Sequence, residues 1–473
     1  MDWKMETQTP YPRRWLALAL LCAAQFIVIL DTSIIGVALP AIQTHLGFTP
    51  EGLSWIFNAY VIAFGGLLLL GGKLGDVFGT RRMFMLGFLV LTGASLLAGL
   101  AGNQAVLLMG RALQGVGAAL IAPSALAIVM RLFGHSGAEL GRAFGFWGAA
   151  AAAGGTAGVF LGGVITEWLS WPWTFLVNVP LGALVFTLAP TVIGRSTPGV
   201  GRIDWLGAVT VTAALVTAVY AIVTNEPGHW ASVNTLLLIA AAAALLAIFL
   251  VLQAVRREPL LPLRIFAAPN LAAGNVLMAL LGAAWIPLWF YLNLYLQQTL
   301  QLSALASGLA LLPMTVTIMI LMVGFSSRII GRIGVKASIV LGLLAMGGAL
   351  VLFTNVPLTG DYFANVLPAS LLAAIGMSLA YIPITMSGMA GARPEETGLA
   401  SGLVNTTYQV GSAVGLAVMV AIAAANGASD NPSALLEGFQ SAFSGAAWVA
   451  FGAVIFALVF LRGAPAAKEV PAG

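Results

Sequence analysis

Fourteen apolar runs of roughly 20 residues each divide this sequence, and they constrain its fold more than any other feature. A helix of about 20 residues rises roughly 30 Å, which is the thickness of the hydrocarbon core of a bilayer. Only 8% of the 473 residues are charged, whereas a soluble domain carries roughly 25%. The chain is therefore predicted to be an all-α polytopic membrane protein with 14 transmembrane helices.

Polar residues, Gly and Pro mark the ends of these runs, and we expect one helix in each run. The first six expected helices cover 15–38, 52–71, 83–101, 105–129, 143–166 and 173–193. Two more cover 205–224 and 233–253. The last six cover 270–296, 304–326, 337–355, 364–388, 398–424 and 439–461.

The charges between the runs predict the orientation of the helices. All of the 20 Lys and Arg residues except Arg111 fall on the side of the N-terminus. They are Lys4, Arg13, Arg14, Lys73, Arg81, Arg82, Arg131, Arg142, Arg195, Arg202, Arg256, Arg257, Arg264, Arg328, Arg332, Lys336, Arg393, Arg462 and Lys468. The opposite side carries Glu51, Glu167, Glu226, Asp361, Asp430 and Glu437. Because cytoplasmic loops retain Lys and Arg, both termini are predicted to be cytoplasmic. The basic residues form no single stripe, so we expect no nucleic-acid partner.

Asp31 is the only acidic residue well inside an expected helix, and Arg111 is the only basic one. A charged side chain at the bilayer centre costs at least about 2.5 kcal/mol. The two residues fall at nearly the same depth, because the first helix runs outward and the fourth runs inward. We expect both to face one cavity in the outer half, where burial favours the neutral acid and Arg111 favours the carboxylate. A static structural ion pair is the alternative.

Small and polar residues beside this pair predict close helix contacts. Gln114 follows Arg111 by three residues and shares its helix face, so we expect it at the same cavity. Gly154, Gly158 and Gly162 recur every four residues and predict tight packing of the fifth helix. Lipid-exposed low complexity is the alternative for these glycines.

Aromatic and amide residues gather in the ninth expected helix, at Trp285, Trp289, Tyr291 and Asn293. Aromatic rings in a cavity suit lipophilic, planar or cationic ligands, so this group is a candidate wall of a substrate cavity. Because the group approaches the outer interface, an aromatic belt is the alternative.

The short connection between the second and third helices contains Gly72, Asp76, Gly79 and Arg81. Glycine allows close helix approach, and Asp76 can pair with Arg81 or cap a helix N-terminus. We interpret this connection as a conformational latch, with a plain turn rich in cytoplasmic charge as the alternative.

The sequence shows no phosphate-binding loop, metal-ligand cluster or nucleophile beside a base. We therefore expect no enzyme activity, no cofactor and no metal site. Transport would then draw its energy from an ion gradient or from downhill flow of the substrate.

Several motifs together resemble the Major Facilitator Superfamily, and in particular its fourteen-span drug:proton antiporter branch. Residues 30–40 resemble the helix 1 signature of that branch, residues 55–60 the helix 2 signature, and residues 72–82 the loop 2-3 motif. Residues 111–117 resemble the helix 4 motif, whose arginine the family implicates in proton transfer. The resemblance covers nearly the whole chain.

The resemblance implies a domain organisation around a central cavity. It gives a cytoplasmic tail (1–14), an N-terminal six-helix bundle (15–193), an inserted helix pair with its loops (194–269), a C-terminal six-helix bundle (270–461) and a second cytoplasmic tail (462–473). It also places Trp55, Asn58, Asn405 and Gln409 at the cavity. The two bundles would rock to give alternating access.

The function implied is proton-coupled efflux of small lipophilic compounds, with Asp31 and Arg111 coupling transport to a proton gradient. The second bundle shows no acidic residue for its cavity, which favours neutral, monocationic or zwitterionic cargo. Val159 stands where the branch carries proline, so a uniporter stays open as an alternative. Export of one endogenous metabolite or antibiotic is a second alternative, and a non-transporting membrane sensor is a remote one. We expect a monomer in the cytoplasmic (inner) membrane of a bacterium.

Overall fold

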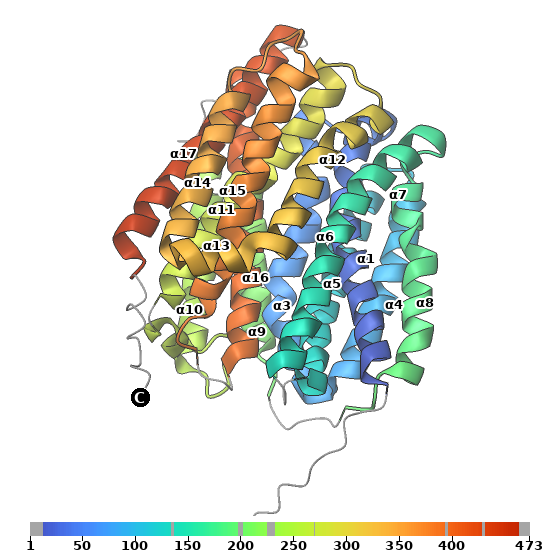
Figure 1. The fold of residues 1–473 in the computed structure, drawn as a ribbon, viewed down its shortest axis with the longest axis vertical. Helices are drawn as coiled ribbons and strands as arrows, with labels where there is room; N and C mark the ends of the chain where they lie inside the picture. The colour runs from blue at the N-terminus through green and yellow to red at the C-terminus, as the bar shows by residue number, and fades with distance from the viewer. Residues whose placement is uncertain are drawn as a thin grey trace, which may run out of the picture.

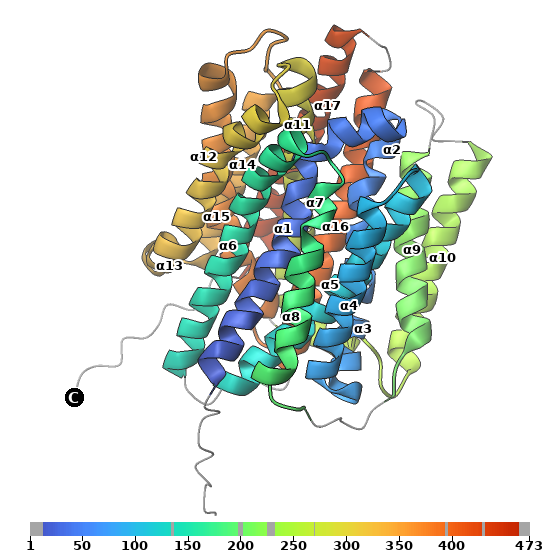
Figure 2. The ribbon, with the colours of Figure 1, turned by 90° about the vertical axis from the view of Figure 1, so that its right-hand side faces the viewer.

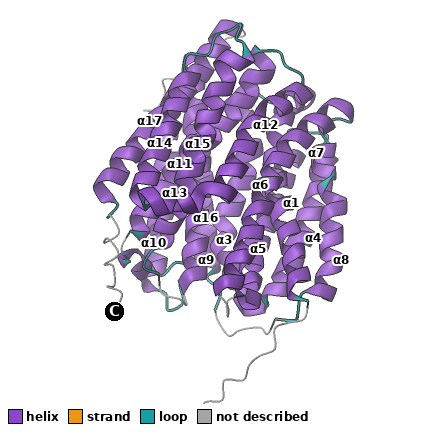
Figure 3. Cartoon of the chain, viewed as in Figure 1, coloured by secondary structure: helices purple, strands orange, loops and turns teal. Residues whose placement is uncertain are grey.

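The computed structural model describes residues 13–133, 137–196, 202–224, 232–268, 270–392, 396–427 and 431–462. The described residues form helices and connecting loops, without a strand (Figure 3). Fourteen helical segments among them are long and apolar enough to cross a membrane, which confirms the predicted fold class. Of the residues named above, Lys4, Glu226, Arg393, Asp430 and Lys468 lie outside the described residues, as do most of the two predicted tails.

The first six spans pack together as one bundle, called the N-terminal bundle below (Figure 1). Its helices are α1 (Arg14–Leu46), α2 (Pro50–Leu53), α3 (Trp55–Phe78), α4 (Thr80–Gly99), α5 (Gln104–Phe133), α6 (Gly137–Trp168), α7 (Trp173–Leu176) and α8 (Asn178–Val192). Helix α1 packs along α6, and α5 packs along α3 and α4. The short helices α2 and α7 complete the spans of α3 and α8.

The last six spans form the C-terminal bundle. Its elements are α11 (Leu271–Leu294) with η2 (Tyr295–Thr299), α12 (Ala304–Ile320) with η3 (Leu321–Phe325), α13 (Ser326–Ile333), α14 (Val335–Phe353), η4 (Tyr362–Val366) with α15 (Leu367–Met389), α16 (Thr397–Asn426) and α17 (Pro432–Phe460). Between the bundles in the chain come α9 (Trp205–Val223), α10 (Val233–Val255) and the one-turn η1 (Leu263–Ala267).

Several helices extend beyond the apolar runs that predict them. Helix α1 continues through Pro40 to Leu46, because an interior proline removes one backbone hydrogen bond without ending a helix that is packed on its neighbours. Helix α17 begins at Pro432, seven residues before the predicted position 439. Proline suits the first turn of a helix, and the side chain of Asn431 accepts a hydrogen bond from the backbone N–H of Ser433.

The two bundles meet along two seams, α3 against α16 and α6 against α12. Helix α9 packs on both α3 and α16, whereas the α6–α12 seam faces the viewer uncovered in Figure 1. Small residues allow these contacts: a Cβ placed on Gly163 of α6 would lie 2.8 Å from the carbonyl oxygen of Ala304 in α12. In a bilayer such close backbone contact supplies much of the attraction between helices.

The contacts between the bundles include a polar group at the end where α1 finishes, opposite the start of α1 (Figure 2). Gln297 donates to the backbone oxygen of Val37 at 2.9 Å, and Gln298 donates to Gln43 at 2.7 Å. At the α6–α12 seam, Glu167 accepts a hydrogen bond from the backbone N–H of Leu305 at 3.2 Å. This end of the molecule is therefore closed by direct contacts between the bundles.

Candidate functional site

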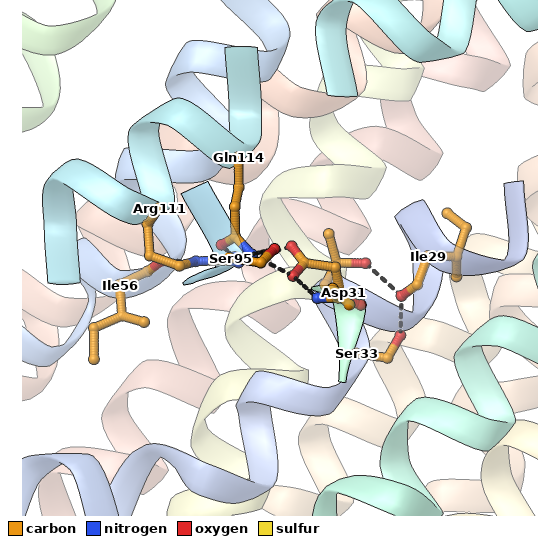
Figure 4. Close-up of polar contacts among 9 residues, drawn as sticks. Ile29, Asp31, Ser33, Ile56, Ser95, Arg111 and Gln114 are labelled. Atoms are coloured by element: carbon orange, nitrogen blue, oxygen red, sulfur yellow. Dashed lines mark hydrogen bonds and ion pairs between the residues drawn. The ribbon is translucent and has the colours of Figure 1, made fainter. Parts of the chain in front are cut away.

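The carboxylate of Asp31 lies inside the N-terminal bundle and receives three hydrogen bonds from side chains. Arg111 Nη1 donates to Oδ2 at 2.8 Å, while Gln114 Nε2 and Asn178 Nδ2 donate to Oδ1 at 2.7 Å and 2.6 Å. Helices α1, α5 and α8 supply these four residues. The pairing of Asp31 with Arg111 predicted from their depths is thus present, and Figure 4 shows both side chains with Gln114 between helices.

The guanidinium of Arg111 is held from several directions. Its Nε donates to the backbone oxygen of Ile56 in α3 at 3.0 Å, and its Nη1 also donates to Gln114 Oε1 at 2.8 Å (Figure 4). The ring of Tyr60 lies 4.6 Å from the guanidinium carbon, a cation–π distance. Arg111 therefore connects α5 to both α1 and α3.

Two neighbouring hydroxyl groups of α1 bond to the helix backbone and not to the Asp31 carboxylate. The hydroxyls of Thr32 and Ser33 donate to the backbone oxygen of Ile29, one turn earlier in α1. Hydroxyls in helices commonly bond to the carbonyl of the preceding turn in this way. Ser95 of α4 accepts a hydrogen bond from Gln114 Nε2 at 2.8 Å and so extends the network to a fifth helix (Figure 4).

In the described structure the pair is enclosed by protein and does not line an open cavity. Asp31 is 1% exposed, and Arg111 and Gln114 are 0% exposed. Depth along the helices placed the residues at one level, but the sequence did not show that α3, α4 and α8 enclose them. Such burial makes a complete set of partners more important, because an unpaired charge here costs several kcal/mol.

Ser95 and Asn178 belong to this network, and the sequence analysis missed both. Asn178 stands five residues inside the sixth apolar run, close to the depth of Arg111, so the depth argument applied to neutral polar residues would have found it. It is the first residue of α8, just after the break at Val177. Pro180 follows in the first turn of α8 and cannot donate a backbone hydrogen bond to the preceding turn, which accounts for the break.

The predicted cavity residues of α11 fall into two groups. The rings of Trp285 and Trp289 stack with centroids 6.2 Å apart, and Trp289 Nε1 lies 3.1 Å from where a Cβ on Gly36 of α1 would be. Asn293 lies against the same glycine and donates to the backbone oxygen of Trp289. These three residues face the place where α11 meets α1.

Tyr291 points elsewhere in the described structure. Its ring packs against Phe439 and Phe443 of α17 inside the C-terminal bundle. The aromatic composition of the ninth run did not reveal that α17 covers this face of α11. Tyr291 is therefore a core residue of the C-terminal bundle.

Four further predicted cavity residues are scattered. Trp55 packs beside Tyr220 of α9, with centroids 6.4 Å apart, so it faces the inserted pair and not a cavity. Asn58 is 0% exposed, and Asn405 is exposed and donates to Ser401 in its own helix. Gln409 lies at the α3–α16 seam, 2.7 Å from where a Cβ on Gly65 would be.

A cavity of about 820 Å³ lies in another part of the molecule, at the ends of α14, α15 and α17 nearest α13. None of the predicted cavity residues lines it. The described structure therefore brings Asp31, Arg111 and Gln114 together, but it does not join them to the aromatic pair of α11 in one open cavity.

The predicted latch residues surround the single-residue connection between α3 and α4. Gly79 has φ = 97°, a conformation that favours glycine, and a Cβ there would lie 3.0 Å from the hydroxyl of Ser196. The backbone N–H of Arg81 donates to the same hydroxyl oxygen, and its Nη1 donates to the backbone oxygen of Ile193. A Cβ on Gly72 would lie 3.7 Å from Pro123 of α5.

Of the two roles open to Asp76, pairing with Arg81 is not seen among the described residues. Its side chain is exposed, and Arg81 instead contacts the segment that follows α8. Lys73, in the preceding turn, forms an ion pair with Glu258 at 3.3 Å, in the loop after α10. The connection is thus tied to two other loops through its basic residues.

The predicted glycines of the fifth span face α1. A Cβ on Gly154, Gly158 or Gly162 would lie 2.6–2.7 Å from an atom of α1. On an adjacent face of α6, the carbonyl oxygen of Val159 lies 2.8 Å from where a Cβ on Gly308 of α12 would be. The residue that replaces the expected proline therefore sits at the seam between the bundles, in a helix that continues without interruption.

Comparison with known proteins places the whole chain in one family. A profile described as Major Facilitator Superfamily matches residues 21–416. The cephamycin export protein CmcT of Amycolatopsis lactamdurans is 39% identical over 439 residues, which cover 91% of this chain and 89% of that protein. The puromycin resistance protein pur8 of Streptomyces alboniger is 34% identical over 463 residues, which cover 96% and 91%.

The fold is also similar to that of a solved transporter. The crystal structure of the human organic anion transporter MFSD10 (TETRAN) superposes with a TM-score of 0.64 at 16% identity, covering 94% of this chain and 100% of that one. This likeness concerns the fold alone. By its profile match and its relatives, the chain belongs to the Major Facilitator Superfamily of membrane transporters, which are not enzymes.

Proposed function

We propose that this transporter exports small lipophilic compounds in exchange for protons. The observation that carries the proposal is the fully buried ion pair of Asp31 and Arg111 inside an apolar bundle. Burying two charges is costly, and a buried pair seldom adds stability over apolar residues of the same volume. A pair kept at this depth in a transporter is best explained by a carboxylate that gains and loses a proton.

Protonation of Asp31 would neutralise the partner of Arg111 and weaken the contact between α1 and α5. We infer that this change favours release of cargo and resetting of the two bundles. With both termini in the cytoplasm of a bacterium, as the charge distribution predicts, the end closed by Gln297, Gln298 and Glu167 faces outward. Alternating access then requires this end to open, driven by a proton gradient across the cytoplasmic membrane.

The cargo we propose is neutral, monocationic or zwitterionic. Among the described residues of the C-terminal bundle, no Asp, Glu, Lys or Arg is buried. Stacked Trp285 and Trp289 offer flat apolar surface where α11 meets α1. A multivalent cation would lack a second anionic partner there.

A single antibiotic as the dedicated cargo is the second candidate. The names of the relatives favour it, since one exports cephamycin and another confers puromycin resistance. Competition between cephamycin, puromycin and a panel of unrelated lipophilic drugs separates the two candidates. Inhibition by one compound alone supports a dedicated exporter.

Substrate-induced pH change in proteoliposomes that carry a proton gradient tests the coupling. Wild type is expected to dissipate the gradient when cargo is added, whereas Asp31→Asn, which keeps the shape and part of the hydrogen bonding, is expected to lose this response. Equal dissipation by Asp31→Asn and wild type would refute coupling through Asp31. Transport by wild type without any pH change would support a uniporter.

A further inference from the structure

We propose that Asn178 is the group that responds to protonation of Asp31, by turning over its side-chain amide. In the described state its Nδ2 donates to the ionised carboxylate, and after protonation its Oδ1 accepts the new O–H. This inference rests on the proposed function and adds a positioning residue to it.

The three side-chain hydrogen bonds to the carboxylate in the described structure all come from N–H donors. Oδ1 accepts hydrogen bonds from Gln114 and Asn178, and Oδ2 accepts one from Arg111. A protonated carboxyl group carries one O–H donor, which needs an acceptor when it is buried. Neutralising Asp31 without another change would therefore leave that O–H facing N–H groups.

Only one of the three donors has a free acceptor. Arg111 has no acceptor atom at all. Gln114 is held at both ends, because its Oε1 accepts from Arg111 while its Nε2 donates to Asp31 and to Ser95. Asn178 makes one side-chain hydrogen bond, and its buried Oδ1 has no partner among the described residues. A half-turn of the Asn178 amide loses one bond and supplies the missing acceptor.

Few titratable groups face the carboxylate from the helices packed against it. Among the described residues, the charged or titratable groups that interact with Asp31 are Arg111 of α5 and Tyr60 of α3, which lies under the guanidinium. Helix α4 reaches the network only through Ser95, and α8 only through Asn178. Helix α6, which packs along α1, supplies no group that titrates beside Asp31.

Because of the position of Asn178 in the chain, its hydrogen bond to Asp31 links two helices. Asn178 is the first residue of α8, so its hydrogen bond to Asp31 ties the start of α8 to the middle of α1. Protonation replaces a charge-assisted bond with a neutral one, which is roughly half as strong. At the same time Arg111 Nη1 loses its anion and keeps only Gln114, while its Nη2 already lacks a partner among the described residues. Protonation therefore loosens α1 from α5 and α8 together.

Infrared difference spectroscopy during a pH titration of the reconstituted protein tests this. The carboxylic C=O band that disappears in Asp31→Asn reports protonation of Asp31. In wild type labelled with ¹³C-asparagine, a side-chain amide band is expected to shift with the same midpoint, and this shift should be missing in Asp31→Asn. An asparagine band that stays constant through the titration would overturn the switch, and this measurement needs no change at Asn178.

The variant Asn178→Leu removes donor and acceptor and keeps the branched shape of the side chain. Because the charge-assisted bond is the stronger of the two, protonation becomes easier, by about tenfold, and the midpoint moves up by about one pH unit. Asn275→Leu is the matched control: Asn275 is a buried asparagine of α11 whose amide bonds to Leu271 and Gly388, far from Asp31 in the chain. In Asn275→Leu the midpoint of Asp31 protonation is expected to equal that of wild type.

The two failures are distinguishable. If Asp31→Asn loses coupled transport while Asn178→Leu folds and keeps the wild-type midpoint, the proposed function stands and the role of Asn178 falls. If Asp31→Asn transports as wild type does, the proposed function itself falls.

Discussion

The two bundles have similar helical layouts but differ in what they bury. The N-terminal bundle encloses Asp31, Arg111, Gln114 and Asn178 in one hydrogen-bonded network. The described part of the C-terminal bundle buries no charged residue and instead packs aromatic rings, with Tyr291 against Phe439 and Phe443. In the proposed function the two halves do different work: the N-terminal bundle takes up the proton, and the C-terminal bundle offers apolar surface to the cargo.

Removing one partner of the ion pair should have the largest effect. Arg111→Leu leaves the Asp31 carboxylate buried with two neutral donors, and breaking a buried pair in this way costs about 3–5 kcal/mol. We expect a clear fall in the thermal unfolding midpoint of the detergent-solubilised protein. The double variant Asp31→Asn/Arg111→Leu should recover much of this loss, because no unpaired charge is left. If Arg111→Leu is as stable as wild type, the buried ion pair does not distinguish the N-terminal bundle energetically from the C-terminal one.

The seam between the bundles comes next. A Cβ on Gly163 would lie 2.8 Å from the backbone oxygen of Ala304 and 3.0 Å from Leu305 Cα. Backbone atoms cannot rotate away, so Gly163→Val should disfavour the closed arrangement by about 1–3 kcal/mol. Gly148→Val in the same helix is the control, since a Cβ there meets nothing within 4 Å.

Cross-linking measures the opening of this seam. Cysteines replacing Glu167 and Leu305, in a Cys22→Ala background that removes the single native cysteine, report whether the closed end forms. Cross-linking should slow in Gly163→Val and stay unchanged in Gly148→Val. Equal rates in both would mean that the two bundles do not rely on this contact.

We expect the smallest effect from a change to the stacked tryptophans of the C-terminal bundle. Trp289→Ala removes one ring of the stacked pair, and an aromatic contact of this kind is worth about 0.5–1.5 kcal/mol. We expect weaker binding of aromatic cargo by roughly 2–12-fold, with the midpoint of Asp31 protonation unchanged. Trp448→Ala is the control, because Trp448 of α17 is 75% exposed. A shifted midpoint in Trp289→Ala would show that the aromatic residues take part in coupling.

The sequence predicted the spans well and the side-chain environment less well. Apolar length and the depth of Asp31 and Arg111 follow from helical rise alone, so they can be read from one chain. Which face of a helix meets which neighbour depends on long-range packing. For that reason Trp55 was assigned to a cavity although it contacts α9, and Tyr291 was assigned there although it contacts α17.

The depth argument was applied only to the charged residues in the apolar runs, and for this reason the neutral residues Asn178 and Ser95 were missed. A lone Asp or Arg in an apolar run demands an explanation, whereas an asparagine or serine does not stand out. Asn178 and Ser95 nevertheless complete the partners of Asp31 and Gln114. For Asp76 the sequence left an ion pair with Arg81 or a helix cap open, and among the described residues Arg81 contacts the segment after α8 instead.

The inserted pair makes the two seams unequal for a molecule dissolved in the bilayer. Helix α9 lies along both α3 and α16, and a Cβ on Gly66 of α3 would lie 2.6 Å from the hydroxyl of Thr212, so this seam is covered from the lipid side. The α6–α12 seam has no such cover among the described helices. A compound that diffuses in the plane of the bilayer therefore meets a covered seam at α3–α16 and, among the described helices, a bare seam at α6–α12.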